Sequence, residues 1–425
     1  LTYSYMNKYA ISLTMRGDGS SMVSEKNTFG FFPSVSPSWD MKREKFLSGV
    51  DFVTMLKFRT GYGQSGNLGG IKSYTTLNTV KENGIVSING APTVTMGSIK
   101  NTNPNLKWET RSTFNIGFDL GLWSNRLMLT SEFYYSKTTD MLYEYDVPVP
   151  TFAFDKLMAN IGSMSNQGVE FAINAIAIEG KKLRWELGFN ATYNVNRIEN
   201  LTSSTGSGDY YVETGGISSG TGNNIQRHQE GLPANTFFVY ETEYNDKGIL
   251  EIVNQDDDPR ITEKDLIAYH SSMPNVTLGF QTRWEFYNFD LGFTLRSSLN
   301  NYVYNDVKAT KIASLKSPER EGAYSNVMLH SLDLYNDIQG SSNITTDNAY
   351  KMDRLVENAS FLRCDNITLG YTFKKQDLNA RVYGTISNPF VISGYSGLDP
   401  EVFNGIDNNI YPRSMTVLLG VSLQF

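Results

Sequence analysis

Long runs of apolar residues that alternate strictly with small or polar residues dominate this sequence. The clearest runs cover residues 113–122, 183–195, 276–280, 289–296, 367–374 and 415–425. A period of two places successive side chains on opposite faces of a pleated strand. Strands in soluble sandwiches are usually about five or six residues long, whereas a tilted strand that crosses a bilayer needs about nine to eleven. The length of these runs favours membrane-crossing strands.

Each run predicts one apolar and one polar face. We expect the polar faces to line a water-filled lumen with a set of residues that share this inward position: Arg184, Glu186, Asn190, Asn194, Asp290, Thr294 and Arg296. On the apolar faces, the aromatic residues Trp185, Tyr193, Tyr371 and Phe425 are expected at the lipid interface. The alternative is that these rings pack in a protein core.

The connections between the runs alternate between short and long. The short ones are 6–7, 41–54, 123–125, 179–182, 285–286 and 374–378, and the long ones are 17–28, 64–107, 144–165, 198–273, 298–360 and 388–413. An antiparallel up-and-down β-barrel with tight periplasmic turns and long outer loops has this asymmetry. The sequence therefore predicts an all-β, transmembrane, antiparallel barrel. Residues 263–270 and 309–315 inside two long loops favour helix.

The strand count indicates an incomplete barrel. Residues 1–425 supply about twelve spanning strands and a partial one at residues 1–5. An open sheet in lipid would leave unpaired N–H and C=O groups at both edges, at several kcal/mol for each group. We therefore expect strands upstream of residue 1 to close the barrel.

Composition narrows the function classes. The chain has 37 Lys and Arg against 44 Asp and Glu, and its net charge of −7 argues against nucleic-acid binding. One cysteine, Cys364, excludes an internal disulfide. We find no nucleophile elbow, phosphate-binding loop or histidine pair at metal-ligand spacing. The sequence is thus predicted not to be an enzyme and to need no cofactor.

One acidic cluster resembles a calcium-binding loop. Asn254, Asp256, Asp258 and Asp265 occupy places 1, 3, 5 and 12 of the pattern in which oxygen ligands converge on Ca²⁺. Pro259 stands where the sharp turn requires glycine. The alternatives are therefore a Ca²⁺ site and a solvated acidic turn.

Two tyrosines are candidate substrate contacts outside the lumen. Tyr210 and Tyr211 lie in the Gly- and Ser-rich segment 203–224. Exposed aromatic rings stack on sugars or peptides, although packing within the loop is the alternative for each ring.

Specific strings carry a family resemblance along nearly the whole chain. These strings are RGDGSS at 16–21, FGFFPSVSPSWDM at 29–41, LKFRTGYGQSGN at 56–67, NPNLKWE at 103–109, NIGSMSNQGVE at 160–170, FLRCDNITLGYTF at 361–373 and NPFVISGYSGLDPEV at 388–402. In this order they resemble the C-terminal half of the SusC/RagA-type TonB-linked outer-membrane transporters of Bacteroidetes.

The resemblance implies a 22-stranded barrel, of which residues 1–425 form the C-terminal part, with an upstream plug domain. It implies partners as well: a SusD-like lipoprotein lid, the TonB–ExbB–ExbD system acting through the missing N-terminal region, outer-membrane lipid, and a dimer of transporter–lid pairs. The loop 198–273 corresponds to a family loop that contacts the lid.

The expected function is TonB-dependent import of oligosaccharides or peptides across the bacterial outer membrane. A passive porin and a surface glycan-binding or adhesion module without transport are the alternatives. Loss of uptake after deletion of TonB separates the first from the other two.

Overall fold

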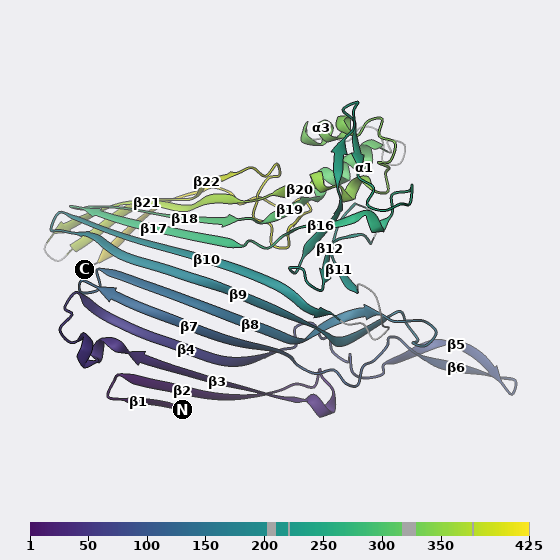
Figure 1. Cartoon of the computed structure of the whole chain (residues 1–425), viewed down its shortest axis with the longest axis horizontal. Helices are drawn as coiled ribbons and strands as arrows, with labels where there is room; N and C mark the ends of the chain where they lie inside the picture. The colour runs from purple at the N-terminus through teal and green to yellow at the C-terminus, as the bar shows by residue number, and fades with distance from the viewer. Residues whose placement is uncertain (202–209, 220–221, 317–328, 376–377, 425) are drawn as a thin grey trace.

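The long alternating runs form one large sheet in the computed structural model, which describes residues 1–201, 210–219, 222–316, 329–375 and 378–424 (Figure 1). Thirteen strands of the described chain make up this sheet. They are β1 (Thr2–Tyr5), β2 (Tyr9–Gly19), β3 (Phe29–Asp40), β4 (Val53–Asn67), β7 (Glu109–Leu122), β8 (Leu127–Asp146), β9 (Lys156–Glu179), β10 (Leu183–Leu201), β17 (Val276–Phe286), β18 (Phe289–Leu299), β21 (Phe361–Lys375), β22 (Leu378–Ser393) and β24 (Thr416–Gln424).

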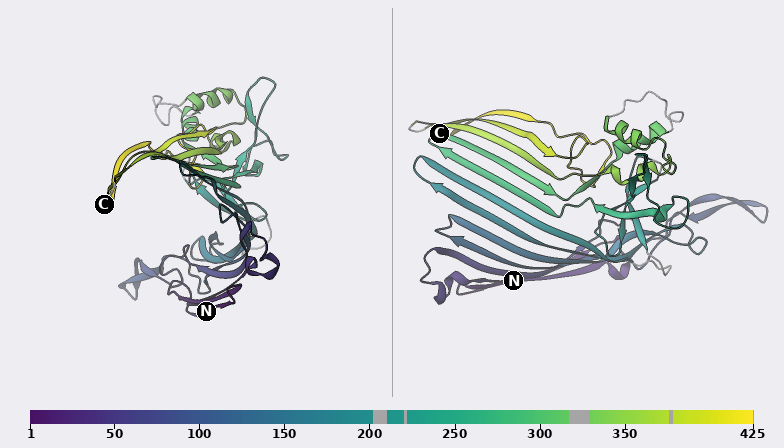
Figure 2. Two further views of the ribbon diagram at one scale, coloured as in Figure 1. Left: turned by 90° about the vertical axis from the view of Figure 1, so that its left-hand side faces the viewer. Right: turned by 45° about the horizontal axis from the view of Figure 1, so that its top comes forward.

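The sheet is an up-and-down wall in which every neighbouring pair is antiparallel. Seen end-on, it curves through an open arc with the two termini at its two ends (Figure 2). Twelve long strands and the short β1 match the predicted count. Within the described residues, β1 and β24 each pair on one side only.

The register places the apolar residues of neighbouring strands side by side. Phe58 pairs with Phe118, and Trp185 pairs with Trp284, with their rings stacked at 4.3 Å between centroids. Tyr371 packs edge-on against Phe289 at 4.7 Å, close to the short turns. The rings expected at the lipid interface thus share the apolar face, apart from Phe425, which lies outside the described residues.

Short turns gather at one end of the wall and long loops at the other (Figure 1). Several predicted boundaries are wrong by a few residues, as at the 388–413 loop, where β22 runs to Ser393. The 144–165 loop shrinks to residues 147–155, because β8 and β9 keep pairing as far as Asp146 and Lys156. The turn placed at 285–286 lies at 287–288, because Phe286 still pairs with Phe289.

The long loops fold into structure of their own beyond the wall (Figure 1). Their elements are β5 (Val80–Ile88), β6 (Ala91–Ser98), β11 (Tyr211–Gly216), β12 (Asn224–Gln229), β13 (Thr236–Tyr240), β14 (Thr242–Tyr244), β15 (Leu250–Ile252), β16 (Leu266–Ser271), β19 (Tyr302–Asn305), β20 (Val356–Asn358), β23 (Ile406–Asp407), α1 (Asp306–Lys316), α3 (Leu329–Asp337) and short 3₁₀ helices at Glu25–Asn27, Glu263–Asp265, Ala349–Lys351 and Asp353–Leu355. Two further 3₁₀ helices, Met41–Arg43 and Lys45–Leu47, lie in the connection between β3 and β4. None of the described helices is long and apolar enough to cross a membrane.

The loops 198–273, 298–360 and 388–413 share one apolar core, and together they form what we call the outer domain. Phe237 and Leu250 from the first loop pack with Tyr304 and Ile338 from the second and with Ile406 from the third. These five side chains are fully buried. The helix predicted at 309–315 is confirmed within α1. The helix predicted at 263–270 is wrong beyond Asp265, because residues 266–271 pair with β13 as β16.

Candidate functional site

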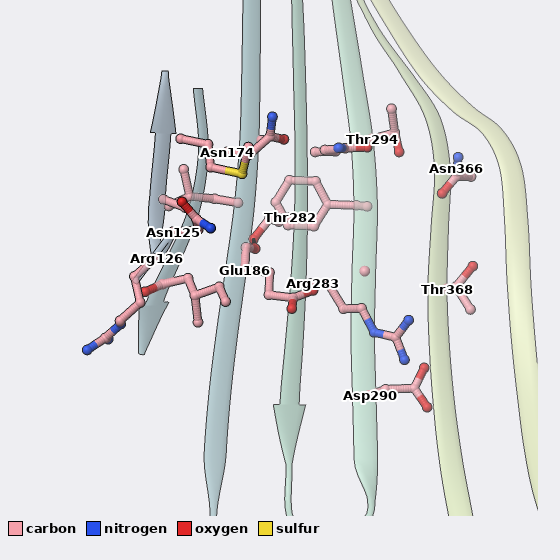
Figure 3. A pocket seen from close by; sticks show the side chains of 18 of the residues that line it. Asn125, Arg126, Asn174, Glu186, Thr282, Arg283, Asp290, Thr294, Asn366 and Thr368 are labelled. Atoms are coloured by element: carbon pink, nitrogen blue, oxygen red, sulfur yellow. Dashed lines mark hydrogen bonds between the residues drawn. The ribbon is translucent and has the colours of Figure 1, made fainter. Parts of the chain in front are cut away.

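A cavity of about 530 Å³ lies against the wall near the short turns. Its lining comes from β8, β9, β10, β17, β18, β21, β22 and the 123–126 turn, as the close-up shows (Figure 3). Only the concave face of a curved sheet directs side chains from so many strands into one space. The lining residues are Asn125, Arg126, Met128, Asn174, Ala175, Ile176, Glu186, Leu187, Gly188, Gln281, Thr282, Arg283, Asp290, Gly292, Phe293, Thr294, Asn366, Thr368 and Arg381.

An ion pair that crosses a whole strand orders one side of this cavity. The Arg381 guanidinium on β22 donates to both carboxylate oxygens of Asp290 on β18, at 2.9 and 2.6 Å. Gly370 on β21 lies between them, and a Cβ there would come within 2.5 Å of Asp290 Oδ1. Glycine is therefore required for the two charges to meet.

The same arrangement recurs elsewhere on the concave face. The Tyr134 hydroxyl on β8 donates to Asn194 Oδ1 on β10, and it crosses β9 at Gly168, where a Cβ would lie 2.6 Å from that hydroxyl. Glycines facing inward thus let polar side chains from alternate strands join in networks. Fixed charges and amides oriented in this way suit a hydrated solute better than an apolar one.

The structure gathers three of the predicted lumen residues at the cavity and places the others elsewhere. Glu186, Asp290 and Thr294 line the cavity, and Glu186 forms an ion pair with Arg184. Asn190 lies further along β10, where its side chain covers Gly279 of β17. Arg296 points to the outer loops instead.

Arg296 fastens an outer loop to the wall. Its guanidinium donates to Glu401 at 2.8 and 2.6 Å and to Asp365 at 2.8 Å. Glu401, in the loop after β22, also accepts an ion pair from Arg413 at 2.9 Å. Burial alone would raise the pKa of the Glu401 carboxyl, but the hydrogen bonds and charge of Arg296, with Arg413 and Arg363, hold that pKa below its ordinary value.

Several cavity residues were missed from the sequence. Gln281 and Arg283 lie at inward positions just beyond the recognised run 276–280, so extending its period of two along β17 would have found them. Arg381 lies on β22, a strand that is not among the recognised runs. Asp365 gives no such signal. A β-bulge between Cys364 and Asn366 interrupts the alternation there.

The loop tyrosines pack within the outer domain. Tyr210 is half-buried against the apolar clusters around Tyr145 and Ile198, and burial raises its pKa to about 12. Tyr211 lies 4.0 Å from the Arg227 guanidinium, in a cation–π contact. Residues 202–209 and 220–221 of the Gly- and Ser-rich segment lie outside the described residues. A role for these tyrosines in substrate binding stays a prediction.

The acidic cluster folds as a series of side-chain-capped turns. Asn254 Oδ1 accepts from the Asp256 N–H, Asp256 Oδ1 from the Asp258 N–H, and Asp258 forms an ion pair with Arg260 at 3.1 Å. The fully buried Asp265 accepts from the backbone of Thr262 and Gln255. No group of three or more His, Cys, Asp or Glu side chains suited to a metal occurs in the described ranges. The geometry gives the calcium hypothesis no support.

Comparison with known proteins agrees with this architecture. The family "TonB dependent receptor-like, beta-barrel" matches residues 1–383. The chain is 40% identical to the TonB-dependent receptor SusC of Bacteroides thetaiotaomicron. The alignment is 439 positions long and covers all of this chain and 43% of that receptor. It is 27% identical to the TonB-dependent receptor P3 of Formosa agariphila, again over the whole chain and 45% of the relative.

A solved structure shares the fold. The RagAB peptide transporter superposes with a TM-score of 0.80 over the whole chain and 46% of that chain, at 23% identity. The chain spans less than half the length of the curated relatives it matches. From the family match, the identity to SusC and the curved antiparallel wall, we conclude that this chain belongs to the SusC/RagA-type TonB-dependent receptors, which are β-barrel proteins of the bacterial outer membrane.

Proposed function

We propose that the chain forms the C-terminal part of the barrel of an active importer that moves a hydrated oligosaccharide or peptide across the outer membrane. The observation that carries this proposal is the charged concave wall around the cavity of Glu186, Arg283 and Asp290. Rigid ion pairs and amides along such a wall replace part of the hydration of a polar solute without binding it irreversibly.

We also propose the other components of the transport system, on the basis of family membership. Strands and a plug domain from elsewhere in the polypeptide close and gate the barrel, which has 22 strands in all. TonB, with ExbB and ExbD, supplies the energy, and a SusD-like surface lipoprotein covers the outer end. The lipoprotein contacts the 198–273 loop of this chain, and two transporter–lid pairs form a dimer. The name of the RagAB peptide transporter keeps peptide open as a substrate beside oligosaccharide.

Growth of matched bacterial strains tests this function. The receptor gene is deleted first, and growth on individual polysaccharides and on a peptide digest as sole carbon source identifies the nutrient that depends on it. Deletion of tonB should then abolish growth on that nutrient, and growth on glucose is the control. If growth persists without TonB, the barrel is a passive porin. If deletion of the receptor gene changes growth on none of the nutrients but removes the binding of a labelled one to the cells, the chain is a binding module.

A second experiment tests the lid. The full-length receptor is purified from native outer membranes in mild detergent, and the proteins that co-purify are identified by mass spectrometry. A surface lipoprotein in near-equal amount is expected, and its absence would remove the lid from the proposal while leaving transport intact.

A further inference from the structure

A row of polar residues crosses the apolar face of the wall toward its outer end. The row runs in register through the neighbouring strands β4, β7, β8, β9 and β10, and its members are Gln64, Ser112, Lys137, Ser165 and Arg197. We call it the polar row. The next row toward the short turns is mostly apolar and aromatic: Tyr62, Phe114, Tyr135, Gln167 and Val195. The polar row therefore marks the upper limit of the apolar surface on these strands.

The height of the polar row places it at the membrane surface. On β8, ten residues lead from Leu127 at the short turn to Lys137. At about 3.3 Å per residue and a tilt of about 40°, this length rises about 25 Å, which is the height of the apolar band of a membrane barrel. Such a band ends in aromatic residues, and the exposed rings of Tyr135 and Tyr193 lie on the short-turn side of the row. Lipid headgroups meet the wall at this level.

Lys137 and Arg197 give the polar row a positive charge. Both side chains are exposed, and neither forms an ion pair or a side-chain hydrogen bond with any residue that the structure describes. They flank Ser165 across β9, so their backbones lie about 10 Å apart and both long side chains can reach one ligand. Glu199, also on β10, accepts a hydrogen bond from the Ser165 hydroxyl. Two cations beside this one carboxylate leave the group positively charged.

We propose that the polar row binds the headgroup of a phosphorylated glycolipid in the outer leaflet, with the acyl chains of the lipid against the apolar face. Arginine binds phosphate through two parallel hydrogen bonds, and lysine binds it as a point charge. Basic residues at a membrane surface attract anionic lipids.

The neutral members of the polar row suit the sugar part of such a headgroup. The Gln64 amide donates to Ser112 Oγ at 3.2 Å. The hydroxyl of Ser112 then still has its own hydrogen to donate to a sugar oxygen. A simple phosphodiester headgroup would engage the two cations and leave these residues to water.

Native mass spectrometry of the delipidated full-length receptor tests this site. The probes are monophosphoryl lipid A, the same lipid after removal of its phosphate, and phosphatidylglycerol. Monophosphoryl lipid A should bind most tightly, and millimolar inorganic phosphate should not displace it. Lys137→Gln and Arg197→Gln should each weaken its binding about threefold to tenfold, and the double variant about tenfold to a hundredfold.

Matched variants separate the position of the charge from its amount. Lys247→Gln combined with Arg260→Gln removes the same two charges from exposed residues of the outer domain, and this control should bind the lipid like the wild type. Lys137→Arg combined with Arg197→Lys keeps both charges on the row and should retain binding. If the double row variant does not fold, as judged by its shift on unheated gels, the two single variants carry the test.

The proposal is overturned if removal of the phosphate leaves binding unchanged, if phosphatidylglycerol binds as tightly as lipid A, or if free phosphate displaces the lipid. It is also overturned if the row variants bind lipid like the control but lose association between receptor copies, because the row would then be a protein interface. Lipid binding needs neither TonB nor a nutrient, so its outcome is independent of the proposed transport function.

Discussion

Arg381 and Asp290 form a two-point ion pair although a complete strand separates them. Their meeting depends on Gly370, because a Cβ at that position would lie 2.5 Å from Asp290 Oδ1 and 2.8 Å from Arg381 Nε. The pair is mostly buried, with the Asp290 side chain 13% exposed. An uncompensated partner would therefore retain much of its desolvation cost.

We expect Gly370→Val to break this ion pair and to lower the melting temperature of the full-length receptor in detergent. Asp290→Asn should lower stability by roughly 1.5–3 kcal/mol, the range for a hydrogen bond to a charged group. Both effects are measured as the temperature of pre-incubation at which the receptor loses its mobility shift on unheated gels. Gly384→Ala, on the apolar face of the adjacent strand β22, is the matched control, and an equal loss in this control would argue against a specific role for the ion pair.

Glu401 should make the loop after β22 sensitive to acid. Because its pKa is held below the ordinary value, the stabilisation by its ion pairs is complete above about pH 4.5 and is lost as the pH falls through the lowered pKa. Limited proteolysis of residues 394–415 from pH 6 to pH 3 should show the loop opening at the acid end.

The variant Glu401→Gln removes the charge and nearly keeps the shape. It should open the loop at every pH, because Arg296 and Arg413 then lose their shared carboxylate. Glu251→Gln in the outer domain is the control. Equal protection of the loop in Glu401→Gln and wild type would show that the ion pairs do not hold it.

His228 should give the outer domain a second dependence on pH. Its Nδ1 lies 2.8 Å from the Tyr143 hydroxyl and its Nε2 lies 3.0 Å from Asn235 Oδ1. Burial lowers its pKa, so the folded form keeps the ring neutral, and stability should decline as the pH falls below about 6.5 through the lowered pKa. Hydrogen exchange of β12 between pH 7.5 and pH 5 measures this decline. The dependence should disappear in His228→Phe.

The acidic cluster should not bind calcium. Asp258 and Asp265 already accept backbone or guanidinium donors, and the metal would have to replace these bonds. Calorimetric titration of the full-length receptor with Ca²⁺ should show no heat up to millimolar concentration. Heat that Asp256→Asn abolishes would establish the calcium site after all.

The wall could be predicted from the sequence because its chemistry is local. A strand between lipid and water must alternate apolar with polar residues. The positions of Trp185 and Glu186 in the sequence therefore predict which face of the sheet each occupies. The outer domain could not be predicted in this way. Its core joins Phe237, Tyr304 and Ile406 from three loops, and no short-range pattern announces contacts between segments so far apart.

The cavity at the short turns could be predicted in part. Glu186 and Asp290 were found because they lie on strongly periodic strands, whereas Arg296 was placed on the correct face but not in its loop contact.

The strict alternation of the wall separates two selective pressures along one chain. Every second residue meets acyl chains and must stay apolar, and the residues between them are free to vary with whatever solute the concave face meets. A lineage could therefore exchange one nutrient for another through scattered substitutions at alternate positions, with no cost to how the protein sits in its membrane.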